Sequence, residues 1–536
     1  MMNISNVRGN NGISKCGEIH LPALFICCGI LCPLFIPYSK MSVMIQKTWA
    51  VVGGIILLLF CVRSICLRKP FANHADRVLK TFLVFGVVEI VIAILQSFRI
   101  LSSYNSYFRF TGSFENPAIL AMLMSVCLPI CLFYTIKSTE KNKKTWCFLT
   151  LCFVLCLLLA ESRTCIIAGV CSSFVIVFFE CPQFRSYLSN KKVWIPALGG
   201  CVIMLIVLYF YKRDSADGRT LLWAVSLKMI AEKPLLGWGD DGFSASYMPH
   251  QAAFLLQHPD SKLVYLADNV THPFNEFLLF GIKYGLVGLS TLSFMIAFLF
   301  RMFLRIKDAY KSIYLSILLI LFILSMFSYP FMVPMIWLIG VYVVCSVVCI
   351  YCMKHSGIRI PIMSLLLAGV LWIVIQNRHI YNEWQWHKLQ VSSAPTETIR
   401  YNYARLYPSL KANPSFMYNY GAWLHHNGYY GESLEILNEC INSLDDYNVE
   451  LLLADNYRQL GDIEKSIEKF EVANAMVPSR FLPLYHEMIT YEGVGDYVNA
   501  CRIARKIVNK PVKVQRSTSV KRIIREAKEI ISSQTK

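Results

Sequence analysis

Residues 118–136 read AILAMLMSVCLPICLFYTI, a run without a single charged side chain. Because a helix needs about 20 mainly apolar residues to cross a bilayer, this run predicts a membrane span. Similar runs recur on both sides of it, so the sequence predicts an all-α, polytopic transmembrane bundle within residues 21–377. The predicted spans, about eleven by this length criterion, are 21–38, 45–62, 81–98, 118–136, 145–160, 164–179, 193–211, 280–300, 313–329, 330–352 and 360–377.

The composition supports the membrane class. The chain has 536 residues, of which 55% are hydrophobic and 16% charged, and its mean hydropathy is +0.47. A soluble protein of this length would need a more polar surface. The net charge of +18 does not indicate a nucleic-acid partner, because the excess belongs to the membrane part. Residues 1–377 hold 32 Lys and Arg against 16 Asp and Glu, whereas residues 378–536 hold 20 against 18.

The distribution of basic residues predicts the orientation. If residues 1–20 are cytoplasmic, the segments on that side hold 20 of the 32 Lys and Arg residues of the membrane part, as expected for cytoplasmic segments. The predicted topology is therefore N-in and C-out. The long polar loop 212–272 and the tail 378–536 then lie outside, which in a bacterial inner membrane means the periplasm. ATP and nucleotide sugars are absent there, so an enzyme at that face must use a donor that is already activated.

The tail contains a repeat over residues 414–511. Gly428 and Gly461 are 33 residues apart, and Gly461 and Gly495 are 34 apart. A 34-residue period with Gly in a turn between two helices resembles the tetratricopeptide repeat. Such helix pairs stack into an α-solenoid. The repeats either dock a periplasmic partner or steady the membrane domain. Residues 378–413 are expected to link the two parts, and residues 512–536 to form a basic final helix.

Arg219 is the first candidate site residue. The sequence predicts a helix over Asp217–Glu232 with Asp217 as its N-cap, which puts Arg219 in the first turn. That turn attracts anions and disfavours a cation, so an Arg there gains most from a bound anion. Its planar guanidinium suits phosphate oxygens. The alternative is an Arg that only reaches to the membrane interface.

Arg163 is the second candidate. It lies in Glu161-Ser162-Arg163-Thr164, a tight predicted connection between two spans on the outer side. The other short outer connections of this chain hold few basic residues, so an Arg at this place is unexpected. Arg163 either binds an anion or simply lies at the membrane interface.

His272 and Glu89 complete the candidates. His272 lies where the outer loop re-enters the membrane, and an imidazole can take a proton from a hydroxyl near neutral pH. A lone His in a loop is more often a capping or hydrogen-bonding residue, and that is the alternative role. Glu89 is the clear acid within a predicted span, and it is either functional or a hydrogen-bonding residue inside the bundle.

Two other patterns are rejected as cofactor or metal sites. Gly237-Trp-Gly239-Asp-Asp-Gly242 fits the dinucleotide-binding pattern, but no βαβ unit surrounds it. Asp240 and Asp241 are better explained by turn chemistry than by a metal.

Five short motifs then follow one another in a distinctive order: Gly112-x-Phe114-x-Asn116-Pro117, Ser162-Arg163-Thr164, Arg219-x-x-x-Trp223, Lys233-Pro-Leu-Leu-Gly-Trp-Gly239, and Asn275-Glu276-x-Leu278. In this order they resemble the O-antigen ligase and polymerase superfamily over about residues 20–350, most strongly over 218–288. A tetratricopeptide tail is also similar to that of some members.

The resemblance implies a metal-independent, inverting transfer that needs no cofactor. A glycan on undecaprenyl diphosphate would pass to a hydroxyl of lipid A–core, of a growing polysaccharide, or of a protein. Arg163 and Arg219 would hold the diphosphate, and His272 would activate or orient the acceptor. Many members have His directly before the Asn-Glu pair, where this chain has Phe274. His250 and His258 are weaker substitutes. A non-catalytic transporter or scaffold is the rival class.

Overall fold

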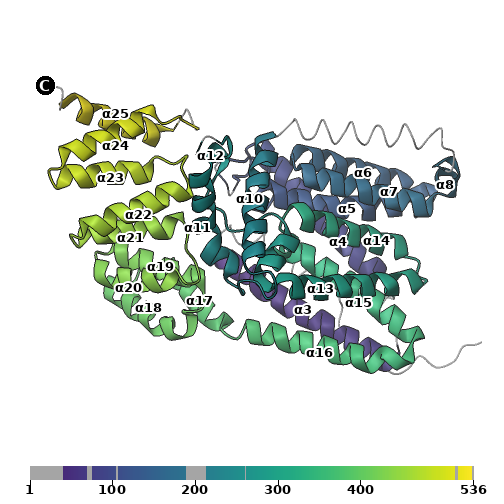
Figure 1. The fold of residues 1–536 in the computed structure, drawn as a ribbon. Helices are drawn as coiled ribbons and strands as arrows, with labels where there is room; N and C mark the ends of the chain where they lie inside the picture. Colours follow the sequence, from purple (N-terminus) through teal and green to yellow (C-terminus); the bar gives the residue numbers. More distant parts are fainter. Residues whose placement is uncertain are drawn as a thin grey trace, which may run out of the picture.

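The computed structural model describes residues 40–68, 75–103, 105, 107–188, 213–259, 261–513 and 517–533. Within these ranges the regular structure is entirely helical, as predicted. Figure 1 shows a bundle of long helices with a stack of shorter helices at one end of it.

Among the described residues, eight helices are long and apolar enough to span a membrane. Each overlaps one of the eleven predicted spans, and the predicted span 313–329 is a shorter apolar helix, α14 (Lys311–Phe327). The predicted spans 21–38 and 193–211 lie outside the described residues. The long helices are α3 (Lys40–Leu67), α4 (Ala75–Ser97), α5 (Pro117–Lys137), α6 (Glu140–Leu159), α7 (Arg163–Glu180), α13 (Glu276–Arg305), α15 (Pro334–Lys354) and α16 (Arg359–Gln376).

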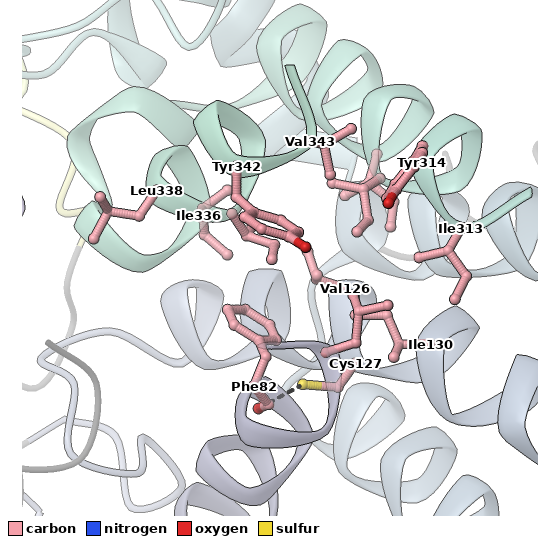
Figure 2. Packing of buried hydrophobic residues seen from close by; sticks show 14 of the residues in the cluster. Phe82, Val126, Cys127, Ile130, Ile313, Tyr314, Ile336, Leu338, Tyr342 and Val343 are labelled. Carbon is pink, nitrogen blue, oxygen red and sulfur yellow. Dashed lines mark hydrogen bonds between the residues drawn. The ribbon is translucent and has the colours of Figure 1, made fainter. Parts of the chain in front are cut away.

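The helices α5 and α15 form the centre of the bundle. In each, 78% of the apolar window is buried, against 11% in α13. Figure 2 shows the apolar side chains of α4, α5, α14 and α15 converging there. Because lipid is as apolar as these side chains, close packing rather than the hydrophobic effect holds such helices together. The central side chains include Phe82, Val126, Cys127, Ile130, Ile313, Tyr314, Tyr342 and Val343.

The outer loop is built from three helices: α10 (Arg213–Glu232), α11 (Gly242–Gln257) and the short α12 (Leu263–Leu266). The predicted N-cap at Asp217 is wrong, because α10 begins four residues earlier. The sequence between Arg213 and Asp217 contains neither Gly nor Pro, so nothing in it stops the helix from starting sooner. Arg219 therefore lies beyond the first turn of α10.

The turn after α10 is fastened to a kink in α13. Gly285 interrupts α13 with φ +62° and ψ −159°. Its neighbours Leu286 and Val287 donate backbone hydrogen bonds to Pro234 O (2.7 Å) and Leu235 O (3.2 Å). A Cβ on Gly285 would lie 2.3 Å from Leu235 O. Only glycine permits both this φ and this close approach.

The remaining bundle elements are short. They are α8 (Pro182–Leu188) and the 3₁₀ turns η2 (Pro330–Met332) and η3 (Ser356–Ile358).

The tail is a stack of helices. The segment expected to link it, 378–413, is itself helical, because Trp386 and Tyr403 pack into the same core as Phe416 of the first repeat. The helices are α17 (Ile380–Leu389), α18 (Thr396–Leu410), α19 (Pro414–His426), α20 (Tyr430–Cys440), α21 (Tyr447–Gln459), α22 (Ile463–Met476), α23 (Leu482–Gly493), α24 (Tyr497–Asn509) and α25 (Thr518–Ser533).

The predicted turn glycines lie between the two helices of each pair. Gly428, Gly461 and Gly495 have φ values of 82°, 84° and 79°, so each adopts the left-handed conformation that closes a helix.

The tail folds back onto the outer loop. Figure 1 shows α21 and α22 beside α11, at the end of the bundle that carries α10 and α12. Tyr447, Ala473 and Met476 of the tail share one apolar cluster with Leu221 and Tyr247 of the loop. Loop and tail therefore lie at the same end of the bundle, as the predicted topology requires.

Candidate functional site

Arg163 and Arg219 come from separate elements and lie near each other. Arg163 is the first residue of α7, directly after a tight connection in which Glu161 has φ +51°. Arg219 lies on α10, and its guanidinium carbon is 5.9 Å from the centre of the Phe274 ring. Burial and the positive charge of Arg163 both lower the pKa of Arg219. The structure thus brings together the two arginines that the sequence singled out.

No ion pair within the described ranges involves Arg219. Its contacts are the Phe274 ring and the electrostatic interactions with Arg163, Cys165 and Tyr329. Two like charges in a partly desolvated place repel each other unless an anion lies between them. The arrangement therefore favours the binding of an anion with several oxygens.

His272 is almost fully buried, with 4% of its surface exposed. Its Nδ1 accepts the backbone N–H of Phe274 at 2.9 Å. A neutral imidazole that accepts at Nδ1 carries its proton on Nε2, and Nε2 lies 3.5 Å from Glu276 Oε2. His272 is therefore bonded to the turn before α13 and lies beside the carboxylate of Glu276, to which its Nε2 makes no hydrogen bond.

Phe274 occupies the place where the resemblance has a second His. Its φ of +52° is left-handed, which is strained for a bulky residue. The bond from Phe274 N–H to His272 holds this conformation on one side. On the other side, Asn275 caps α13 by accepting the N–H groups of Phe277 (2.9 Å) and Leu278 (3.0 Å). The ring of Phe274 is thereby held against Arg219.

The sequence did not single out Tyr329. It follows α14, and its ring centre lies 5.6 Å from that of Phe274 and 6.0 Å from that of His272. Burial raises the pKa of its phenol, and the nearby charge of Arg219 opposes this rise. Tyr329 ends a predicted apolar run, and no neighbouring residue marks it. Only the fold brings it to the other site residues.

Glu89 is a hydrogen-bonding residue inside the bundle, one of the two roles considered for it. It is fully buried and accepts the Ser113 backbone N–H (2.8 Å) and hydroxyl (2.5 Å). Gln96, two turns along the same helix, accepts the Gly112 N–H and donates to Gly112 O. Gly112 has φ +63°, and a Cβ there would lie 2.5 Å from Glu89 Oε2. The motif at residues 112–117 is thus a turn that hydrogen bonds from Glu89 and Gln96 hold in place, and it leads into α5.

In the turn at 237–242, backbone N–H groups that could bind a phosphate are already used in hydrogen bonds to α13. The N–H groups of Trp238 and Gly239 donate to Ile282 O (2.8 Å) and Lys283 O (3.0 Å) of α13. Asp240 accepts the Tyr284 hydroxyl. Among the described residues, no three His, Cys, Asp or Glu side chains gather as a metal site would require.

The two substitute histidines are used in local contacts. His250 lies 2.9 Å from Glu232 and 2.6 Å from Ser246 O, and His258 lies 2.9 Å from Phe254 O.

A cavity of about 220 Å³ opens beside Arg219. It lies between α10, α11, α12 and the segment that leads to α13. A cation and a carboxylate line it together with apolar side chains. Its walls include Arg219, Leu222, Gln251, Leu266, Asp268 and Phe274.

A family model described as O-antigen ligase matches residues 148–292. The matched range begins in α6 and ends in α13, so it contains Arg163, Arg219 and His272. The match confirms the predicted resemblance for this part of the chain and does not extend to the tail. No curated protein matches the chain.

Proposed function

We propose, on the premise that the chain is a multi-pass membrane protein with an O-antigen ligase domain, that it transfers a glycan from undecaprenyl diphosphate to an acceptor hydroxyl on lipid A–core. The observation that carries the proposal is the meeting of Arg163 and Arg219 at the loop end of the bundle. Their mutual repulsion is relieved when a diphosphate binds, and its oxygens match the planar guanidinium groups.

The transfer needs no energy source beyond the donor. The acceptor oxygen forms a bond to the anomeric carbon, and the bond from that carbon to the diphosphate oxygen breaks. The bonding electrons leave with the diphosphate, where Arg163 and Arg219 stabilise the new negative charge. Attack opposite the leaving group inverts the anomeric carbon.

The acceptor proton goes to Glu276 in this proposal. His272 has its accepting nitrogen occupied by Phe274 N–H, so of the two roles considered for it, its contacts favour orientation over activation. Glu276 Oε1 is buried and has no hydrogen-bond partner among the described residues. A carboxylate in that position can accept a proton from a hydroxyl. His272 Nε2 lies 3.5 Å from the other oxygen of Glu276, beside it but without a hydrogen bond to it.

The proposed location is the bacterial inner membrane, with loop and tail in the periplasm. Loop and tail meet through hydrogen bonds such as Ser244 Oγ to Ser443 O at 2.8 Å, so one compartment holds both. Lipid-linked glycans are available at that face, whereas nucleotide-activated sugars are not.

Acceptor choice has two alternatives within the same chemistry. A polymerase would use the end of a growing polysaccharide, and a protein transferase would use a Ser or Thr hydroxyl. Arg163, Arg219 and the pair His272–Glu276 serve all three reactions equally, since each needs a diphosphate site and a proton acceptor.

The test is deletion of the gene in its host and complementation with wild type or variants at equal membrane abundance. Arg219→Ala is the test variant. Arg109→Ala is the matched control, because Arg109 is an exposed basic residue in the segment between α4 and α5. Surface glycans are resolved by size, and undecaprenyl-linked glycan is measured alongside.

We expect undecaprenyl-linked glycan to accumulate in the deletion and with Arg219→Ala but not with Arg109→Ala. Loss of all attached chains then identifies a ligase, single repeat units a polymerase, and a missing glycoprotein a protein transferase. If no glycan changes in any strain, the enzyme proposal fails and a non-catalytic scaffold or transporter replaces it.

A further inference from the structure

The cavity beside Arg219 has a wall that the tail holds in position. Arg480, which follows α22, donates to Asp268 Oδ1 at 2.8 Å, and Asp268 lines the cavity. Ser479 Oγ donates to the neighbouring Ala267 O at 3.4 Å. Arg480 is itself held by Tyr447 of α21, whose ring centre lies 4.5 Å from its guanidinium carbon. The tail therefore fixes the segment that carries Asp268.

A buried glutamine makes the same connection from inside. Gln251 of α11 is 1% exposed. Its Nε2 donates to Met476 O of the tail (2.8 Å) and to Asp268 O (3.2 Å), while its Oε1 accepts the Tyr247 hydroxyl (3.0 Å). Both hydrogen-bonding groups of its amide are engaged, so Gln251 joins tail and loop.

Asp268 keeps one oxygen for a ligand. Its Oδ1 accepts from Arg480 and from the N–H of Asn269 (2.8 Å), and no hydrogen bond within the described ranges uses Oδ2. The side chain is 55% exposed. An ionised carboxylate only accepts hydrogen bonds, so its partner in the cavity must be a donor, such as a hydroxyl group.

The lining of the cavity thus combines three kinds of chemistry. Arg219 suits an anion, Asp268 suits a hydroxyl, and the ring of Phe274 together with Leu222 and Leu266 offers an apolar surface. A sugar ring has hydroxyl donors at its edge and C–H groups on its faces. About 220 Å³ is below the range of most drug-sized sites, so it suits one ring rather than a chain.

We infer that this cavity is the subsite for the sugar attached to the diphosphate, with Asp268 as its hydroxyl-binding residue and Arg480 of the tail as the positioning residue of Asp268. The inference rests on the proposed function, because it takes the diphosphate to lie at Arg163 and Arg219. The tail then takes part in donor recognition through its contact with the loop.

The test compares two probes on the purified full-length protein in lipid nanodiscs. One is undecaprenyl diphosphate without sugar, and the other is the lipid-linked glycan purified from the deletion host. The variants are Asp268→Asn, Arg480→Gln and Arg219→Ala. The control is Arg505→Gln, since Arg505 is an exposed basic residue of α24.

Wild type is expected to bind the glycan-bearing lipid more tightly than the bare lipid. Asp268→Asn should weaken binding of the glycan-bearing lipid about tenfold and leave binding of the bare lipid unchanged, since a hydrogen bond to a charged group is lost only with the first probe. Arg480→Gln should give a smaller loss with the same selectivity, because an exposed ion pair contributes little by itself. Arg505→Gln should change neither affinity.

The outcomes separate this inference from the proposed function. If Asp268→Asn weakens both probes equally, or neither, the sugar subsite is wrong even though Arg219→Ala still weakens both. If wild type binds the two probes equally well, the subsite is also wrong. If Arg219→Ala changes neither affinity, or the deletion host accumulates no lipid-linked glycan, the diphosphate site and the proposed function fail first.

Discussion

At the scale of single residues, the site is held together by the left-handed turn at Phe274. Arg219 lies near one side of the Phe274 ring, Tyr329 packs against it, and His272 fixes its backbone. The effect of substituting one of these side chains can therefore be compared with the effect of substituting another. The contribution of the Tyr329 hydroxyl is the simplest to measure by itself, because Phe keeps the ring and lacks only the hydroxyl.

Tyr329→Phe should reduce transfer about tenfold while the protein remains at normal abundance. Among the described residues no hydrogen bond uses the Tyr329 hydroxyl, which lies near the charge of Arg219. It can therefore donate to the diphosphate, an interaction between a neutral donor and a charged acceptor. The measurement is the rate of lipid-linked donor consumption in nanodiscs. Tyr265→Phe is the control, because Tyr265 of α12 in the outer loop is an exposed tyrosine. Equal rates for wild type and Tyr329→Phe would remove the phenol from the site.

Glu276→Gln should lower the rate roughly a hundredfold or more, because a positioned general base contributes on that order. His272→Asn should be milder than His272→Ala, since an Asn side-chain oxygen can still accept Phe274 N–H and keep the turn. Single-turnover rates at equal donor occupancy measure both effects. If Glu276→Gln retained the full rate and His272→Asn lost it, His272 rather than Glu276 would be the proton acceptor.

The residues of the candidate site could be found from the sequence to different degrees. Arg163, Arg219 and His272 belong to short motifs with charged or polar neighbours, so each could be found from the sequence. The reason given for Arg219, a place in the first helical turn, was wrong because α10 begins at Arg213. Tyr329 lies far along the chain at the end of an apolar run, and its place depends on packing that no local pattern reports.

At the scale of elements, the kink in α13 positions the turn that follows α10. Two backbone hydrogen bonds from α13 reach Pro234 and Leu235, and two from Trp238 and Gly239 return to α13. The motif at 233–239 and the kink at 285–287 are thus two halves of one contact. The sequence gave the motif as part of a family pattern, whereas its pairing with the kink appears only in the fold.

Gly285→Ala should disrupt this contact. The new Cβ would lie 2.3 Å from Leu235 O at φ +62°, and such strain is on the order of 1–3 kcal/mol before any clash is relieved. Hydrogen exchange of residues 234–242 should speed up, and transfer should fall. Gly369→Ala is the control, because a Cβ there makes an ordinary contact at 3.7 Å. Unchanged exchange in Gly285→Ala would show that the kink tolerates a side chain.

Glu487 makes the packing of α23 depend on pH. It is 1% exposed, and burial raises its pKa to about 7. The folded tail binds this proton more tightly than the unfolded chain does. Its stability is therefore greatest below the ordinary carboxyl pKa and falls as pH rises from there to about 7. Above about pH 7 the stabilisation contributed by the proton on Glu487 is fully lost.

Glu487→Gln should remove this dependence. Hydrogen exchange of α23, corrected for intrinsic rates, should show wild type less protected at pH 8 than at pH 5 by on the order of 1–2 kcal/mol. The variant should show a smaller difference. Equal pH dependence in both proteins would place the titration on another group.

The spans could be predicted well because their length and hydropathy are local properties. Each of the eight long apolar helices overlaps a predicted span. Helix ends were less predictable, as α10 shows, because several residues near its start can begin a helix equally well. The helices within 378–413 also went unnoticed, since their stability comes from packing Trp386 and Tyr403 against the first repeat.

At the scale of the whole molecule, loop and tail form one unit at the end of the bundle. Gln251, Asp268 and Ser244 of the loop all bond to the tail. The sequence predicted both parts on the same side but gave no reason for contact between them. Residues about 200 positions apart meet there, which no periodicity or motif spacing reports.

Removal of residues 414–536 should therefore loosen the loop as well as remove the repeats. Met248, Ala252 and Leu255 of α11 lie in the apolar cluster that tail residues complete, and truncation would uncover that cluster. Hydrogen exchange of α11 should rise, while α5 and α15 in the bundle should keep their protection. Slow exchange of α11 in the truncated protein would mean that the loop folds without the tail.

The order in which the chain is made gives this contact a further consequence. Met476 and Arg480 leave the ribosome after every span has been synthesised, yet they complete the wall that holds Asp268. If the cavity is the donor subsite, as we infer, a chain that stops before Arg480 can insert its helices but lacks the tail contacts that hold this wall. The donor subsite would then form only after synthesis has passed the membrane domain and reached the repeats.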